Sequence, residues 1–171
     1  MELVIVIIAF GIIGVISVAI LRSAGDVYWG ITNRKAVVIT NQTALSRMVR
    51  EISLQLDRSR LEYASDDQLQ LVTPRLHTLT YSIGGAQISL SKNENPSRVL
   101  ADHIVLANTS FGYRDSFGNI LNAFPLSSAD RQKVWTIDLE VETGLDTDTL
   151  ALKSTIFPEN LRYGQRMPYH D

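Results

Sequence analysis

Hydrophobic residues are concentrated in one uninterrupted run near the start of the chain. Nineteen uncharged residues occupy positions 3–21, preceded by the acid Glu2 and followed by Arg22. About twenty apolar residues in a helix, each rising about 1.5 Å, span the hydrocarbon core of a bilayer. The run therefore predicts that residues 1–22 form the transmembrane half of an N-terminal helix and that residues 3–21 contact the membrane.

A cleaved secretory signal peptide is the alternative interpretation of this run. The run is longer than the roughly 7–15 apolar residues of a signal peptide core, and no basic residue precedes it. Ile20, Leu21 and Arg22 follow Ala19, so small residues do not mark a cleavage site at its end. We therefore expect a retained membrane helix and a soluble domain after Arg22.

Beyond the apolar run, apolar residues recur every seven positions. The residues of this series are Ala24, Ile31, Val38, Leu45 and Ile52. The spacing, with polar residues between, is typical of an amphipathic helix, although the β-branched residues of 36–40 favour a strand by local propensity. Because no proline occurs before Pro74, we predict one continuous helix from residue 2 to about residue 57, with 23–57 as its amphipathic half.

The apolar stripe of this amphipathic half is expected to pack on the domain that follows. Such a stripe is stable in water only when it is buried against another element. The residues predicted to make the contact between helix and domain are Leu45, Met48, Val49, Ile52 and Leu56.

After residue 57 the hydrophobic period changes to two, which is typical of half-buried strands. The alternation predicts strands at 68–72, 78–83, 86–90, 108–115, 134–142 and 149–157. Gly84 and Gly85, between the second and third of these, predict a two-residue hairpin loop. We therefore predict an α+β fold in which the long N-terminal helix covers one face of an antiparallel β-sheet domain formed by residues 58–171.

Composition excludes several kinds of site. The chain has no cysteine, so it can form neither a disulfide nor a thiolate metal site or nucleophile. The formal net charge is −2 and the basic residues are scattered singly apart from Arg34-Lys35, so no nucleic-acid partner is predicted. His77, His103 and His170 lie at no ligand spacing, and Asp102-His103 is not accompanied by a nucleophile elbow. We predict a protein that is not an enzyme, with no catalytic residue, metal or cofactor.

Two pairs of polar residues place side-chain oxygens close together in the sequence. Asp115 with Asn119, and Asp146 with Asp148, lie in segments that also contain glycine. A calcium site needs six or more oxygen ligands, and the twelve-residue loop pattern is missing. We therefore expect these residues to shape turns.

The segment 2–16 places one glutamate directly before the apolar helix. This segment, Glu2-Leu-Val-Ile-Val-Ile-Ile-Ala-Phe-Gly-Ile-Ile-Gly-Val-Ile16, resembles the N-terminus of type IV pilins and type II secretion pseudopilins. More diffuse similarity to the larger minor pilins continues in segments 46–53, 81–88, 99–104, 110–119, 134–141 and 157–161. The chain most resembles the J-type pseudopilin and its relatives in type IV and mannose-sensitive haemagglutinin pilus systems.

The resemblance implies a minor pilin or pseudopilin subunit that assembles through its N-terminal helix into a filament or tip complex of a type II secretion or type IV pilus system. It implies other pilin-like subunits and an inner-membrane assembly platform as partners. It also implies a single-pass protein of the bacterial inner membrane with its globular domain in the periplasm. Glu2 is implied to pair during assembly with the N-terminal amine of a neighbouring subunit. By the residues alone, Glu2 fits a solvated acid at a helix N-terminus equally well.

The chain departs from the family pattern at its start and in its charge distribution. The family's glycine cleavage junction, with the methylated residue that follows it, is missing because Glu2 stands where the fifth mature residue would be. The prepilin peptidase is therefore expected as a partner only if an upstream leader exists. Arg22, Arg34 and Lys35 follow the apolar run, so the positive-inside rule alone places the domain in the cytoplasm, whereas the resemblance favours the periplasm.

The alternative function is a membrane-tethered extracytoplasmic binding or adhesion domain that acts as a monomer. Both functions need the membrane helix. They differ at Glu2, because only an assembling subunit requires that acid between chains.

Overall fold

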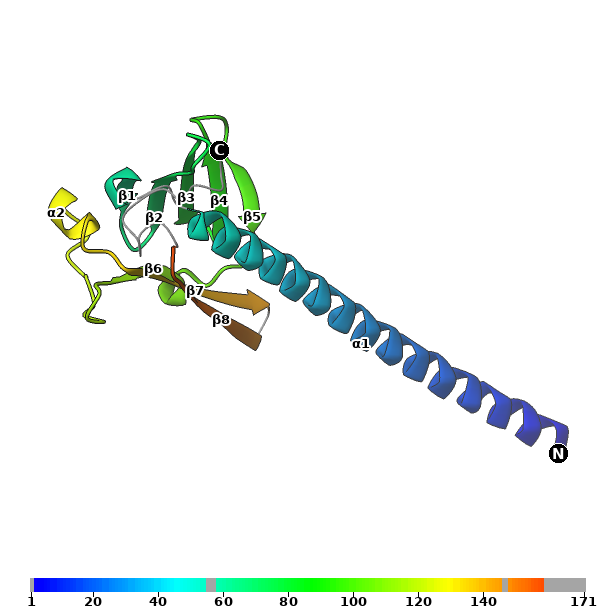
Figure 1. Ribbon diagram of the computed structural model, residues 1–171. Coiled ribbons are helices and arrows are strands. Elements are labelled where there is room, and N and C mark those ends of the chain that lie inside the picture. The colour runs from blue at the N-terminus through cyan, green and yellow to red at the C-terminus, as the bar shows by residue number, and fades with distance from the viewer. Residues whose placement is uncertain (1, 55–57, 146–147, 159–171) are drawn as a thin grey trace. The chain divides into compact units, whose positions relative to one another are not determined.

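The computed structural model describes residues 2–54, 58–145 and 148–158, and Figure 1 shows its helices and strands. The chain divides into two compact units, residues 1–37 and residues 38–171. One helix, α1 (Glu2–Ser53), contributes to both units, and antiparallel strands follow it. The predicted α+β fold is confirmed.

α1 continues without a break through residues 36–40. The β-branched residues there cost only about 0.5 kcal/mol each relative to alanine, and a helix once formed propagates cooperatively. The strand propensity of these residues therefore does not interrupt the helix. The prediction of one continuous helix is confirmed as far as Ser53. Its predicted end near residue 57 lies outside the described residues.

The first strands of the second unit form a five-stranded antiparallel meander that follows the short 3-10 helix η1 (Arg58–Arg60). The strands pair in chain order and are β1 (Leu61–Ala64), β2 (Gln68–Val72), β3 (Thr78–Gly84), β4 (Gln87–Lys92) and β5 (Arg98–Ala101). The sequence pattern does not predict β1 or β5. Each has four residues, too few for an alternation to stand out, and each is an edge strand held by one neighbour.

The remaining strands form a second, three-stranded antiparallel sheet, with order β6-β7-β8. Its strands are β6 (Ser110–Arg114), β7 (Thr136–Leu145) and β8 (Asp148–Ile156). The short 3-10 helix η2 (Leu106–Asn108) precedes β6 in the chain, and the short helix α2 (Ser128–Arg131) lies between β6 and β7. The expectation that the helix covers one sheet is corrected here, because the strands divide into two sheets. The chain leaves the first sheet after β5, where His103 adopts a positive φ of 57° and η2 begins three residues later.

The hairpin between β3 and β4 is shifted by one residue from its predicted position. Gly84 pairs with Gln87, so the two loop residues are Gly85 and Ala86, not Gly84 and Gly85. Both loop residues have a φ of 58°. Positive φ at both central positions is the geometry that fits the right-handed twist of a hairpin, and the sequence shows that a glycine must be present without showing at which loop position.

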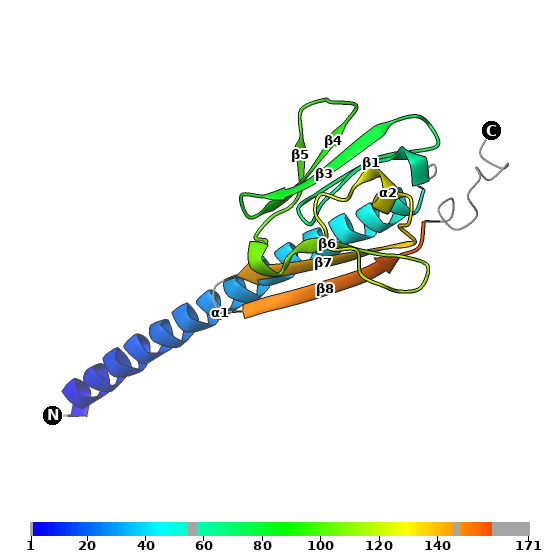
Figure 2. The ribbon, with the colours of Figure 1, turned by 90° about the vertical axis from the view of Figure 1, so that its left-hand side faces the viewer.

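The second part of α1 runs beside both sheets (Figure 2). One hydrophobic core contains buried side chains from this part of α1 and from both sheets. Its largest fully buried side chains are Tyr81, Tyr113, Phe111, Met48, Ile52, Leu61, Leu69, Leu71, Ile88, Ile137 and Leu139. Tyr113 of β6 also connects the sheets by a hydrogen bond, since its hydroxyl donates to the carbonyl oxygen of Ser65 at 2.8 Å. Burial raises the pKa of Tyr113 well above its ordinary value, so the hydroxyl stays protonated and remains a donor.

Candidate functional site

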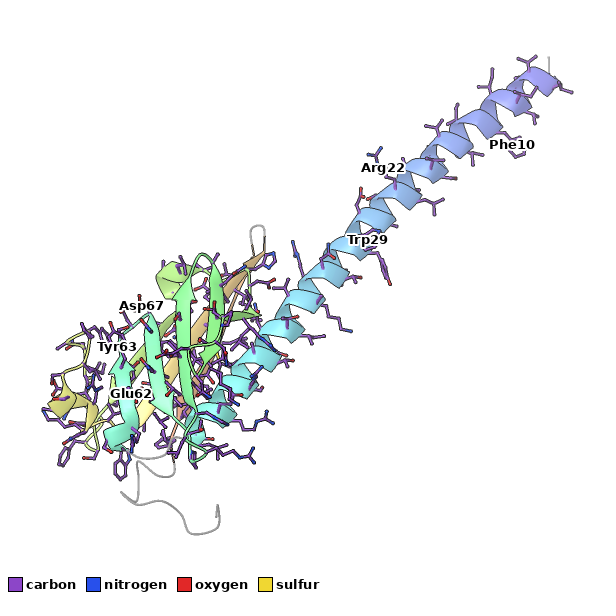
Figure 3. All side chains as sticks on the ribbon, turned by 90° about the horizontal axis from the view of Figure 1, so that it is seen from above. Phe10, Arg22, Trp29, Glu62, Tyr63 and Asp67 are labelled. Carbon is purple, nitrogen blue, oxygen red and sulfur yellow. The ribbon has the colours of Figure 1, made fainter. Side chains whose placement is uncertain are left out.

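The first unit is formed by the apolar part of α1, and its large hydrophobic side chains are exposed from Leu3 to Leu21. Phe10, labelled in Figure 3, is 72% exposed. Among the described residues, α1 is the one helix long and apolar enough to cross a membrane. The chain therefore has one candidate membrane-spanning helix near its N-terminus, which is consistent with a single-pass membrane protein. The side chain of Glu2 lies outside the described part of the structure.

Exposed apolar residues continue along α1 beyond the membrane run. Ile20, Ala24, Val27 and Ile31 share one face of the helix with Ser23 and Tyr28, and this face forms a shallow groove. Val27 and Ile31 are 59% and 62% exposed. Heptad spacing shows which face of a helix is apolar, but it does not show how far along the helix that face is covered.

The covered part of the stripe lies in the second unit, where buried residues follow helical spacing. Asn41, Ala44, Met48 and Ile52 are buried, three or four residues apart. Leu45 and Val49 are half-buried against the same core. The structure thus gathers four of the residues predicted to join helix and domain, and the fifth, Leu56, lies outside the described residues. Asn41 is a polar member of the face, and its Nδ2 donates to the carbonyl oxygen of Asp102 at 3.0 Å.

A polar contact joins the end of α1 to the middle of the five-stranded sheet. The fully buried Tyr81 of β3 donates a hydrogen bond from its hydroxyl to Oε2 of Glu51. Oε1 of Glu51 in turn accepts from Nε of Arg47 at 3.0 Å. Burial, followed by the hydrogen bond to Glu51, raises the pKa of Tyr81 above its ordinary value. The arrangement positions the helix end and keeps the tyrosine protonated.

Two of the three histidines, His77 and His103, lie in the described part of the chain, and each has a polar neighbour. Nδ1 of His77 lies 3.2 Å from Nδ2 of Asn93. Nδ1 of His103 lies 3.1 Å from Oδ1 of Asp102, but both side chains are about half exposed, where solvent screens such a pair. His170 lies outside the described residues. Within the described ranges, no three histidine, aspartate or glutamate side chains gather as a metal-binding group.

The Asp115 carboxylate is satisfied within its own turn. Its Oδ1 accepts from the backbone N–H groups of Phe117 and Asn119 at 2.8 and 2.9 Å, and its Oδ2 accepts from Nδ2 of Asn119 at 2.9 Å. The side-chain hydrogen bond from Asn119, helped by the backbone donors, lowers the pKa of Asp115. These contacts are those of a turn-forming aspartate. The side chains of the second predicted pair, Asp146 and Asp148, lie outside the described part.

Comparison of the chain with models of known protein families finds no match, and comparison with curated proteins finds no significant match either. The long apolar N-terminal helix followed by antiparallel sheets is compatible with a pilin-like fold.

The structure also brings together basic residues that stand apart in the sequence. A groove of about 1310 Å³ lies between the end of α1, the turn before β3, and strands β4 and β5. We call it the basic groove, and its cations are Arg47, Arg50, Arg75, Lys92 and Arg98. Sequence reasoning missed this group because its members come from α1, a turn and two strands that are distant in the sequence. In the sheet, Lys92 pairs with Leu79, and Arg98 with Leu90.

Proposed function

We propose that this chain is a minor pilin or pseudopilin subunit that assembles through α1 into a filament or tip complex of a type II secretion or type IV pilus system. The observation that supports this most is α1 itself. Its exposed apolar beginning and its buried end, with Met48 and Ile52 in the core, belong to one uninterrupted helix. A simple tether requires no such continuity, since a flexible linker holds a domain at a membrane equally well.

In this proposal the exposed apolar residues of α1 face lipid before assembly and the helices of other subunits after it. Exchanging lipid for protein contacts yields little hydrophobic free energy, so close packing and polar pairs must supply the specificity. Glu2 supplies the polar pair by binding the N-terminal amine of a neighbouring subunit. The partners are other pilin-like subunits and an inner-membrane assembly platform, and the globular domain lies in the periplasm.

The test is the recovery of neighbouring subunits with a Glu2→Ala variant. The protein is expressed from its own genomic locus, so that any upstream segment and the flanking genes are retained, and partners are cross-linked and co-purified. Asp26→Ala is the matched control, because it removes an acid from the same helix at another position. Glu2→Ala is expected to lose its partners, because the opposing amine is then unpaired in an apolar surrounding. Membrane insertion is expected to be unchanged or eased.

Equal recovery of partners with Glu2→Ala and Asp26→Ala would refute the role of Glu2. That result would favour the alternative, a membrane-tethered binding or adhesion domain that acts as a monomer.

A further inference from the structure

The basic groove combines two kinds of surface. Its apolar part is formed by leucines and prolines, and its polar part is dominated by cations. The aliphatic residues that line it are Leu54, Leu79, Leu90, Leu100, Pro74 and Pro96. Leu79 and Leu90 are buried, whereas Leu54 is 40% exposed and accessible to a bound molecule.

The charge of the groove is opposite in sign to that of the whole chain. Five cations and His77 line it, and Glu51 is its one acid, in a protein with a formal net charge of −2. Glu51 already accepts from Tyr81 and Arg47. The other four cations are exposed, and none of them makes an ion pair with a residue that the structure describes: Arg50, Arg75, Lys92 and Arg98.

These features select the kind of anion that fits. Guanidinium groups bind carboxylates and phosphates through paired hydrogen bonds. Single-stranded nucleic acid is held mainly by stacking its bases on aromatic rings, and the groove-lining residues include no phenylalanine, tyrosine or tryptophan. An aliphatic surface beside arginines instead suits a polypeptide that alternates acidic and aliphatic side chains. The C-terminal residues 159–171 of this chain do not have that composition, since they contain two arginines and two acids.

We propose that the basic groove binds an extended acidic peptide segment of a partner protein, with carboxylates on the arginines and an aliphatic side chain on the leucines. This goes beyond assembly through α1 and does not depend on it, because every residue involved lies in the second unit. The groove then recognises a partner while α1 anchors the chain.

Binding is tested with the full chain in detergent micelles, by fluorescence anisotropy of a labelled peptide of about 12 residues that alternates aspartate or glutamate with leucine. One control peptide replaces the acids by asparagine and glutamine, and a second replaces the leucines by serine. We expect each control to bind about tenfold more weakly, which corresponds to about 1.4 kcal/mol. Binding is also expected to weaken about tenfold between roughly 50 and 300 mM salt, because exposed charges are screened.

The variant Arg75→Gln with Arg98→Gln locates the site. Its matched control, Lys35→Gln with Arg131→Gln, removes the same charge outside the groove. The first pair is expected to weaken peptide binding about tenfold and the control pair less than about twofold, with equal circular dichroism and urea unfolding for both. Leu54→Ser is expected to weaken binding of the leucine-containing peptide and to leave binding of the serine-containing peptide unchanged.

Three results would overturn the proposal. The first is no saturable binding of the acidic leucine peptide. The second is equal loss of binding in the groove pair and its control. The third is binding of an oligothymidylate of about 20 nucleotides as tight as that of the peptide, which would assign the groove to nucleic acid.

Discussion

Replacing Ile52 by alanine is expected to destabilise the second unit, whereas the same replacement at Ile39 is not. Ile52 is fully buried in the core, and Ile39 is 50% exposed. Both residues lie on α1 and within the second unit, so both replacements change helix propensity in the same way. The comparison therefore isolates the contribution of packing between α1 and the sheets.

The magnitude follows from the carbon atoms that are lost. Isoleucine to alanine removes three buried carbons, each worth about 0.8 kcal/mol, or about 2.4 kcal/mol of transfer free energy. The remaining cavity adds to this, within the range of about 2–5 kcal/mol found for such replacements. The higher helix propensity of alanine offsets about 0.4 kcal/mol of this loss in unfolding free energy. We expect a loss of about 3 kcal/mol for Ile52→Ala and a change within about 0.5 kcal/mol for Ile39→Ala.

The assay is urea unfolding of the full chain in micelles, followed by the fluorescence of Trp135. Trp135 lies in the second unit and is half-buried. Trp29 is 66% exposed on the first unit (Figure 3), so it is replaced by phenylalanine in all variants to remove its signal. Comparable m-values are required, because they show that the variants unfold with the same change in exposed surface.

A loss for Ile52→Ala within about 1 kcal/mol of that for Ile39→Ala would refute the reasoning. The end of α1 would then not be part of the folded core, and the burial of Met48 and Ile52 would have no energetic consequence. A second replacement, Met48→Ala, extends the test to the preceding turn of the helix, with an expected loss in the same range.

Two further predictions concern the buried tyrosine and the independence of the second unit. Tyr81→Phe is expected to lower the free energy of unfolding by about 1–2 kcal/mol near neutral pH, because Oε2 of Glu51 loses its donor. The raised pKa of Tyr81 means that its stabilising effect is complete below about pH 10, the unfolded pKa, and is lost as pH rises above it. Urea unfolding of Tyr81→Phe should therefore depend less steeply on pH above about 10 than that of the wild type, and equal slopes would contradict the assignment. Deleting residues 1–27 should leave a soluble chain with the β-sheet spectrum and no bound metal; stoichiometric zinc or calcium, with loss of stability on chelation, would contradict this.

The alternation of apolar and polar residues predicts six of the eight strands in the described part of the chain. β2 begins and ends where the alternation of Gln68 to Val72 predicts, and β3, β4, β6, β7 and β8 fall within a few residues of their predicted positions. These strands each place one face in the core, so burial imposes a period of two on their side chains. β1 and β5 carry no such signal, because four residues at a sheet edge owe their conformation to the neighbouring strand.

The candidate sites also include some that the sequence predicts and one that it does not. The apolar run at 3–21 and the buried positions Met48 and Ile52 follow from spacing along one helix, which the sequence displays directly. The basic groove does not, because Arg50, Arg75 and Arg98 are more than twenty positions apart and only the meander of β2 to β5 beside α1 brings them together.

The pattern of apolar residues was enough to predict the continuous helix, its apolar beginning and the antiparallel strands that follow it. The helix depends on hydrogen bonds between residues four positions apart, and burial of one face leaves a regular period of apolar residues in helix and strands alike. The division into two sheets, the length of α1 that is buried and the gathering of cations in one groove were decided only by the tertiary structure. They depend on hydrogen bonds and packing between distant segments, and a period along the chain carries no information about which distant segments meet.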